Sequence, residues 1–238
     1  GKLSLTLYME DISPNRSMDL EILAAAAQLP VGAKAVKVVQ LGKKVTAVLD
    51  VKRVKGSVNW QKLPMLGELT ATKATMLPLK TTVSAGWDDK NLYILYTAND
   101  IPGRKPNTEG TKINKPWFSD GVEFFLNRTD EEGMLFHIII DVGNVQYAEN
   151  MTLERKAGDK NILIPKSMVK ADYQFKNDHW TCRITVPWAQ LGGKPAAGKL
   201  IPFNFMRNRR DQGDCSYYTL VPSDKYFTGK QFQFKLTE

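Results

Sequence analysis

The chain has few cysteines and histidines, the residues that bind zinc and form histidine-based catalytic triads. Its 238 residues include two cysteines, Cys182 and Cys215, and two histidines, His137 and His179. Structural zinc needs about four ligands at close spacing, so no zinc motif is present, and a histidine-based triad has little to build on. Cys182 falls in a predicted strand, where a buried free thiol and a disulfide with Cys215 are equally open alternatives.

The sequence also lacks a long hydrophobic run, an internal repeat and a low-complexity tract. No apolar stretch approaches the roughly 18 residues that a membrane-spanning helix needs, so no membrane partner is expected. The first residues, Gly-Lys-Leu-Ser, show no signal-peptide pattern, which leaves export open. A chain of this length buries enough surface to fold without a disulfide or metal framework.

Acidic residues are outnumbered by basic ones. Lys and Arg total 33 and Asp and Glu total 25, which gives a formal charge of +8. Binding to nucleic acid needs several cations on one surface. The densest basic group is Arg207, Arg209 and Arg210, and Asp211 and Asp214 follow it closely. The charge therefore indicates a solvated basic surface, and no nucleic-acid partner is expected.

The dominant pattern is an alternation of apolar and polar residues with a period of two, which is typical of half-buried strands. It predicts hairpins over 81–97 and 171–186 and strands at 121–127, 134–141, 145–148, 201–206, 217–221 and 232–236. A proline start and a glycine stop predict one helical turn over 187–191. Residues 100–116, with three prolines and two glycines, predict a long loop. Many short strands with turn signals predict an all-β fold, an antiparallel β-sandwich.

The first 56 residues follow this alternation less clearly. Strands are predicted at 3–9 and 45–51, whereas the alanine run within 20–29 favours a helix and the Leu-Pro-Val-Gly around residue 30 favours a turn. We therefore expect an N-terminal β-rich segment over 1–56, either a small subdomain or the tail of a preceding domain. The β-sandwich is expected over 57–238.

Four local motifs occur in one order within the sandwich region. They are Trp-Asp-Asp-Lys-Asn-Leu-Tyr-Ile at 87–94, Trp-Phe-Ser-Asp-Gly-Val-Glu-Phe-Phe-Leu-Asn at 117–127, Trp-Thr-Cys-Arg-Ile-Thr-Val-Pro-Trp at 180–188 and Phe-Asn-Phe-Met-Arg at 203–207. Each motif alone has low specificity. Together and in this order, they resemble the family 9 carbohydrate-binding modules and their DOMON-like relatives.

The resemblance implies a β-sandwich that binds carbohydrate: monosaccharides, oligosaccharides or the ends of polysaccharide chains. It also implies a position beside other domains of a larger carbohydrate-active enzyme, such as a glycoside hydrolase, that is secreted or held at the cell surface. In this family an aromatic residue shortly before an acidic strand residue stacks on the sugar. Trp117 and Glu123 match that pair.

The chemistry of Trp117 and Glu123 suits a sugar. A pyranose has an apolar C–H face that an indole covers, and a rim of hydroxyls that a carboxylate accepts from. Trp117 ends the predicted loop, and the alternative is that it caps the core. By alternation, Glu123 shares a strand face with Gly121 and Phe125, so it needs either a ligand hydroxyl or an arginine such as Arg207 as partner.

The late strand supplies the other candidate ligand-binding residues. The resemblance matches Asn204 to the family's late asparagine, whereas Arg207 stands where a second stacking aromatic is expected. Tyr217 or Tyr218 is then the candidate for the second face, and Tyr218 joins the predicted site. The alternatives are that Asn204 holds a strand-end turn and that Arg207 forms an ion pair.

Two further groups of residues receive predictions. The remaining tryptophans are expected in the core: Trp60, Trp87, Trp180 and Trp188. The resemblance implies structural calcium, and the candidate ligands, with backbone carbonyls, are Asp100, Asp120 and Asp141. The chain has no Asp-x-Asp-x-Asp loop, so the sequence alone does not specify a calcium site.

We predict a non-catalytic sugar-binding module and not an enzyme, because no nucleophile and no pair of carboxylates at glycosidase spacing is evident. Two alternatives remain open. One is a structural or docking domain whose pocket is degenerate. The other is a haem-binding electron-transfer domain of the DOMON-like kind, with His137, Met134 or Met206 as axial ligands.

Overall fold

The computed structural model describes residues 47–71, 79–152, 162–163, 169–196, 198–211, 214–219 and 232–238. The chain forms two compact units, Gly1–Lys44 and Val45–Glu238, and all described residues lie in the second. The strand predicted at 3–9 and the helix or turn predicted around 20–30 lie outside the described residues. None of the helices described here is long and apolar enough to cross a membrane.

The described part of the chain is almost entirely β-structure. The first six strands are β1 (Ala47–Arg53), β2 (Met65–Ala71), β3 (Thr81–Trp87), β4 (Asn91–Asn99), β5 (Gly121–Asn127) and β6 (Met134–Asp141). The others are β7 (Gln146–Thr152), β8 (Ile162–Leu163), β9 (Lys170–Phe175), β10 (His179–Pro187), β11 (Ile201–Asp211), β12 (Asp214–Thr219) and β13 (Phe232–Thr237). The helical segments are η1 (Trp60–Lys62), α2 (Glu109–Ile113), η2 (Pro116–Phe118) and η3 (Trp188–Leu191).

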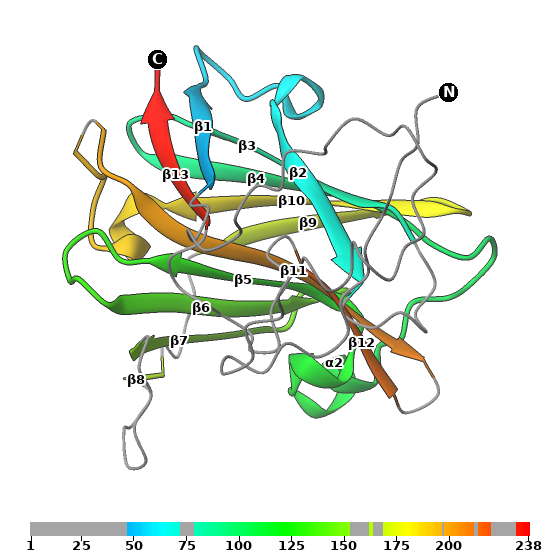
Figure 1. The fold of residues 1–238 in the computed structure, drawn as a ribbon. Coiled ribbons are helices and arrows are strands. Elements are labelled where there is room, and N and C mark those ends of the chain that lie inside the picture. Colours follow the sequence, from blue (N-terminus) through cyan, green and yellow to red (C-terminus); the bar gives the residue numbers. More distant parts are fainter. Residues whose placement is uncertain are drawn as a thin grey trace, which may run out of the picture. The chain divides into compact units, whose positions relative to one another are not determined.

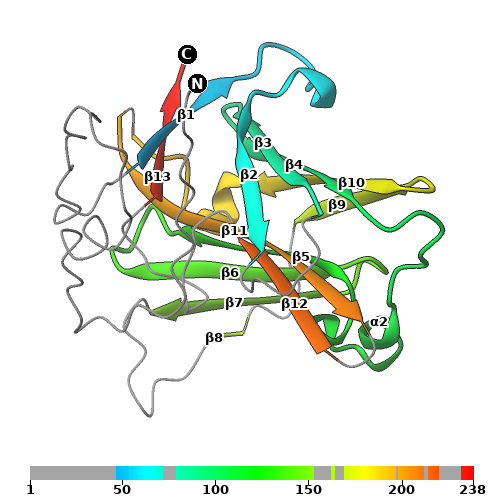
Figure 2. The same cartoon turned by 45° about the vertical axis from the view of Figure 1, so that its right-hand side comes forward.

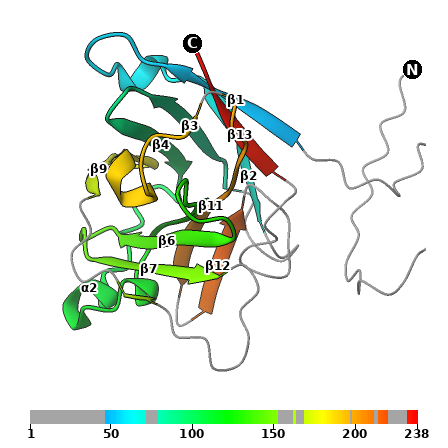
Figure 3. The same ribbon diagram turned by 90° about the vertical axis from the view of Figure 1, so that its left-hand side faces the viewer.

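The strands form one curled sheet that makes two layers, which confirms the predicted β-sandwich. Its main path runs β8-β7-β6-β5-β11-β12-β2-β3-β4-β10-β9. Figure 1 shows β3, β4, β10 and β9 side by side in one layer and β11, β5, β6 and β7 in the other, and Figure 3 shows both layers from the side. The path turns between them where β12 pairs with β2, which can be followed in Figure 2.

One strand departs from the antiparallel pattern. β1 runs parallel to β13 along six residue pairs and parallel to the end of β3, whereas the other pairings are antiparallel. β1 lies within the segment 1–56 that the sequence sets apart. Its pairing nevertheless makes it part of the same sheet as the sandwich strands.

The core lies between the layers because alternate residues of each strand face inward. β5 contributes Val122, Phe124 and Leu126, and β10 contributes Trp180 and Cys182, all of them buried. Cys182 is a free cysteine, so the buried thiol is the alternative that the structure shows. The side chain of Cys215 lies outside the described residues.

The predictions for the tryptophans are correct with one exception. Trp87, Trp180 and Trp188 are buried members of the core, as expected. Trp60 is not: it lies partly exposed in η1, where its ring packs edge-on against Tyr93 with 5.7 Å between centroids. The reason is the side of β4 on which η1 lies: Trp60 meets Tyr93, whereas the core-facing residues of this strand are its neighbours Leu92 and Ile94.

The sequence pattern did not predict β2 or α2, and the structure shows the reason for each. β2 carries a register shift between Met65 and Gly67 where it pairs with β3, and such a bulge breaks the period of two. α2 lies inside the predicted loop 100–116 and is held by tertiary contacts rather than by an apolar stripe. Thr111 of α2 makes two of these contacts: its backbone N–H donates to Ser119 Oγ, and its hydroxyl donates to Asp141.

We expect Phe124→Ala to lower the free energy of unfolding by about 3–5 kcal/mol, because Phe124 is fully buried and its loss leaves a cavity. Phe175→Ala is the matched control, since this ring is 46% exposed. Urea unfolding followed by fluorescence measures both variants. Equal losses for the two variants would contradict the assignment of the core.

Candidate functional site

The outer face of β5, β6, β7 and β11 carries an unusual set of polar and aromatic side chains. The strand registers place Glu123 and Phe125 of β5 beside His137 of β6, and His137 beside Glu149 of β7. On the other side of β5, Asn208 of β11 pairs with Gly121. We call Trp117, Glu123, His137, Tyr147, Glu149 and Asn208 the outer-face cluster.

Trp117 lies at the edge of this cluster and not in the core. Its ring is partly exposed in η2, directly before β5, and meets Tyr147 edge-on at 5.4 Å between centroids. Arg210 of β11 fixes the turn, because its Nε donates to the Trp117 carbonyl oxygen at 2.9 Å. Trp117 is therefore an anchored aromatic side chain with solvent access, which suits a stacking platform.

Glu123 is buried, and both of its carboxylate oxygens have hydrogen-bond partners on the same face of the sheet. His137 Nε2 lies 2.9 Å from Glu123 Oε1, and His137 Nδ1 lies 2.8 Å from Glu149 Oε1. The Tyr147 hydroxyl donates to the second oxygen of Glu149 at 2.7 Å. One imidazole thus links two carboxylates, and Phe125 stacks on it at 4.2 Å between centroids.

These contacts set the charge of His137. Burial opposes protonation of the ring, but the hydrogen bonds to Glu123 and Glu149 outweigh it and raise the pKa of His137 from 6.5 to about 9. The protonated ring donates from both nitrogens. One imidazolium thus lies between two carboxylates in the cluster.

Asn208 completes the cluster and leaves one polar atom free. Its Nδ2 donates to Glu123 Oε2 at 2.8 Å, which orients the amide. The other end, Oδ1, is buried and has no hydrogen-bond partner among the described residues. A buried acceptor of this kind costs stability unless a donor reaches it, so the site calls for a hydroxyl or N–H group at this point.

Arg207 lies on the opposite side of β11 from the cluster. It is 1% exposed, and its guanidinium donates to Thr81 Oγ1 at 3.0 Å and to the Asn99 carbonyl at 2.7 Å, and pairs with Asp100 at 3.1 Å. The group also lies 5.2 Å from the centroid of the Trp180 ring. The structure therefore brings Arg207 to Asp100 and not to Glu123.

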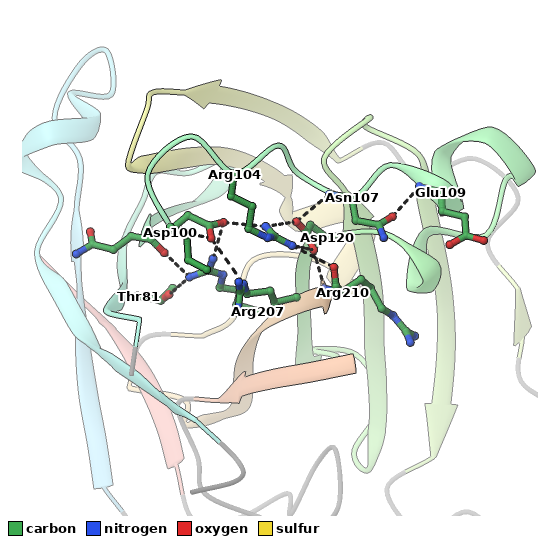
Figure 4. Close-up of polar contacts among 11 residues, drawn as sticks. Thr81, Asp100, Arg104, Asn107, Glu109, Asp120, Arg207 and Arg210 are labelled. Atoms are coloured by element: carbon green, nitrogen blue, oxygen red, sulfur yellow. Dashed lines mark hydrogen bonds and ion pairs between the residues drawn. The ribbon is translucent and has the colours of Figure 1, made fainter. Parts of the chain in front are cut away.

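Asp120 is the centre of a second buried network, shown in Figure 4. Its carboxylate accepts two bonds from Arg104, at 2.7 and 3.1 Å, and backbone N–H bonds from Asn107 and Arg210. Arg104 also pairs with Asp100. The network connects the loop before η2, the start of β5 and the end of β11, so it positions the segment that carries Trp117.

The three predicted calcium ligands do not form one site. Asp100 and Asp120 face guanidinium groups, which repel a cation, and share Arg104 between them. Asp141 accepts from Thr111 Oγ1 and from the backbone N–H groups of Gly143 and Val145. No group of three His, Cys, Asp or Glu side chains is placed to hold a metal ion in the described residues. These aspartates do not fit a calcium shell.

The other predicted residues fall into separate places. Asn204 is buried on the outer face of β11, where its register partner is Phe125. Tyr218 pairs with Arg207 in the sheet register, and its side chain lies outside the described residues. Both ring nitrogens of His137 face carboxylates, so neither is free to bind haem iron as the DOMON-like alternative requires.

The family comparison agrees with this geometry. Residues 54–232 match the family described as "Carbohydrate family 9 binding domain-like". The chain belongs to this family. No curated protein matches the chain.

Solved structures show the same fold as this family 9 domain. One is a family 9 carbohydrate-binding module from Caldicellulosiruptor kristjanssonii in complex with cellotriose, at 14% identity and a TM-score of 0.57, covering 80% of this chain and 94% of that one. A family 9 carbohydrate-binding module from the same organism in complex with glucose gives 14% identity and a TM-score of 0.54, with 80% of this chain and 96% of that one covered. A putative carbohydrate-binding protein from Bacteroides uniformis gives 10% identity and a TM-score of 0.58, with 79% and 99% covered.

We expect Asp120→Ala to destabilise this family 9 domain by about 2–4 kcal/mol, because it removes the closest carboxylate from the partly buried Arg104 and the acceptor of two backbone N–H groups. Asp89→Ala is the matched control: Asp89 pairs with Arg53 and Lys194 at the surface, and its loss should leave the unfolding transition nearly unchanged. Urea unfolding measures both. A small effect of Asp120→Ala would show that the network does not hold the η2 segment.

We also expect the stability of the domain to depend on the charge of His137. Because its folded-state pKa is raised from 6.5 to about 9, the stabilisation is complete below pH 6.5 and is lost as the pH rises through 9. The free energy of unfolding, relative to that of His137→Gln, should fall by on the order of 3 kcal/mol across this range. His179→Gln, at a partly exposed ring, is the control. An imidazole that titrates near pH 6.5 by NMR would refute the assignment.

Proposed function

We propose that this domain is a non-catalytic carbohydrate-binding module and that the outer-face cluster is its sugar site. The observation that carries the proposal is the unpartnered Oδ1 of Asn208 beside Glu123, on the same face as the partly exposed ring of Trp117. A platform for the C–H face of a sugar thus lies on the same face as acceptors for its hydroxyls. The named ligands of the structural relatives, cellotriose and glucose, support the same class of ligand.

The charges of the cluster favour a neutral sugar. The carboxylates of Glu123 and Glu149 lie on either side of the His137 imidazolium, and they disfavour a ligand carboxylate or sulfate placed directly beside them. Hydroxyl donors are favoured for the same reason. Glucose and short glucans therefore fit the site better than uronic acids.

The side of the proposed site opposite Trp117 differs from that of a clamp with two stacking aromatic rings. Arg207 stands at the position of the second aromatic but is buried in its ion pair with Asp100. The aromatic residue that contacts Trp117 is instead Tyr147, which meets its ring edge-on. We propose a one-sided platform with Tyr147 as its flank.

The arrangement of carboxylates supports binding without catalysis. A glycosidase places two carboxylates on either side of the scissile bond. Glu123 and Glu149 instead bind the two nitrogens of one imidazole, so both are committed to His137.

We further propose, from the family alone, that the domain accompanies a larger enzyme that is secreted or held at the cell surface. The flanking coding sequence would test the first part of this proposal, and cell fractionation would test the second.

Titration with glucose and cellotriose, followed by calorimetry, tests the sugar site. We expect Trp117→Ala to weaken binding about ten- to hundredfold, the value of one buried aromatic side chain. Asn208→Ala should weaken it about three- to tenfold, the value of one neutral hydrogen bond. Phe175→Ala, at an exposed ring on another strand, is the control and should bind as wild type does. No response of the wild type to any sugar in a broad panel would remove the proposal.

A further inference from the structure

A second concave surface lies on the other layer of the sandwich. It is a groove of about 360 Å³ over the outer face of β3, β4, β10 and β9, bounded by η1. Its lining includes Trp60, Ser84, Thr97, Thr181, Gln174 and Arg183. The volume is within the range of small-ligand sites, and the groove is separated from the outer-face cluster by the core.

The strand register explains why these side chains meet. Thr181 pairs with Thr97 on one side and Gln174 on the other, and Arg183 pairs with Leu95. Alternation directs them outward, because their neighbours Cys182 and Ile184 face the core. The result is a floor of hydroxyl, amide and methyl groups across three strands.

Trp60 supplies the wall of the groove. The indole is partly exposed and is braced edge-on by Tyr93, which is itself hydrogen-bonded to Asp88. The sequence pattern predicts this tryptophan in the core, and its actual position therefore needs another explanation. An exposed indole beside a polar floor has the composition of a site for a ring with an apolar face and a polar rim.

The charge of the groove differs from that of the outer-face cluster. Arg183 and Lys176 both line it, and the described lining residues include no Asp or Glu. Arg183 Nε is buried without a hydrogen-bond partner among the described residues, and its Nη1 has only a distant ion pair with Asp172, at 3.9 Å. The side chain is 31% exposed, so its terminal nitrogens keep donors for an anionic group in the groove.

We propose that this groove is a second saccharide site and that it binds an acidic sugar, with a uronate carboxylate on Arg183 and the sugar ring against Trp60. The site is independent of the sugar site proposed at Trp117. The two sites divide ligands by charge, since carboxylates line one and cations line the other.

Binding of methyl glucuronoside and methyl glucoside, followed by the indole N–H resonances in NMR, tests the inference. The two ligands differ only at C6, where the glucuronoside has a carboxylate and the glucoside a hydroxymethyl group. The resonance of Trp60 is assigned with Trp60→Phe. We expect the glucuronoside to shift the Trp60 resonance, and Arg183→Gln to weaken this binding at least about tenfold, the value of a charge-assisted hydrogen bond. Lys235→Gln removes the same charge at the exposed ion pair with Asp50 and should bind as wild type does.

Each outcome decides between the two sites. A Trp60 shift that is equal for both glycosides, or that survives Arg183→Gln in a variant with a native amide spectrum, would overturn the acidic-sugar assignment. An unchanged Trp60 resonance at saturating glucuronoside would overturn the second site altogether. A missing response of Trp117 to the glucoside would count only against the first site.

Discussion

The carboxylate of Asp120 holds together the parts of the fold on which the outer-face cluster depends. It accepts four hydrogen bonds from two segments: the loop that carries Arg104 and Asn107, and the end of β11 at Arg210. Asp120 itself directly precedes β5, the strand of Glu123. Because Arg210 also binds the Trp117 carbonyl, the same few bonds set the position of the aromatic platform relative to the buried acid.

The polar groups of the domain are separated by strand alternation. On β11, Asn208 faces the cluster, whereas Arg207 and Arg209 turn the other way and meet Asp100. A shift of one residue in this register would exchange the two sets and leave Glu123 without its amide partner. The register of β11 against β5 is therefore as important to the site as the identity of its residues.

The sequence predicted the sandwich and most strands because their period of two is regular, and it predicted Trp117 and Glu123 from their order in one motif. It did not reveal His137, Tyr147, Glu149 and Asn208 as one cluster, since three strands bring them together and only the register shows which faces coincide. Counting alternate residues forward from Asn204, which the motif marks as a site residue, places Asn208 on the same face. For Arg207 the sequence left ligand contact and an ion pair open, and the structure shows the ion pair with Asp100. Trp60 was misjudged because residue type alone does not show which side of the sheet a turn lies on.

The pairing of β1 with β13 has a consequence for where the domain can be cut. The match to the family begins at residue 54, after β1 ends at Arg53. A fragment that starts there strips β13 of its parallel neighbour and exposes a row of unsatisfied backbone groups next to Phe234 and Leu236. Such an open edge invites strand addition from another molecule, so self-association of a fragment that starts at residue 54 and keeps β13 would reflect the missing strand and not the natural state of the domain.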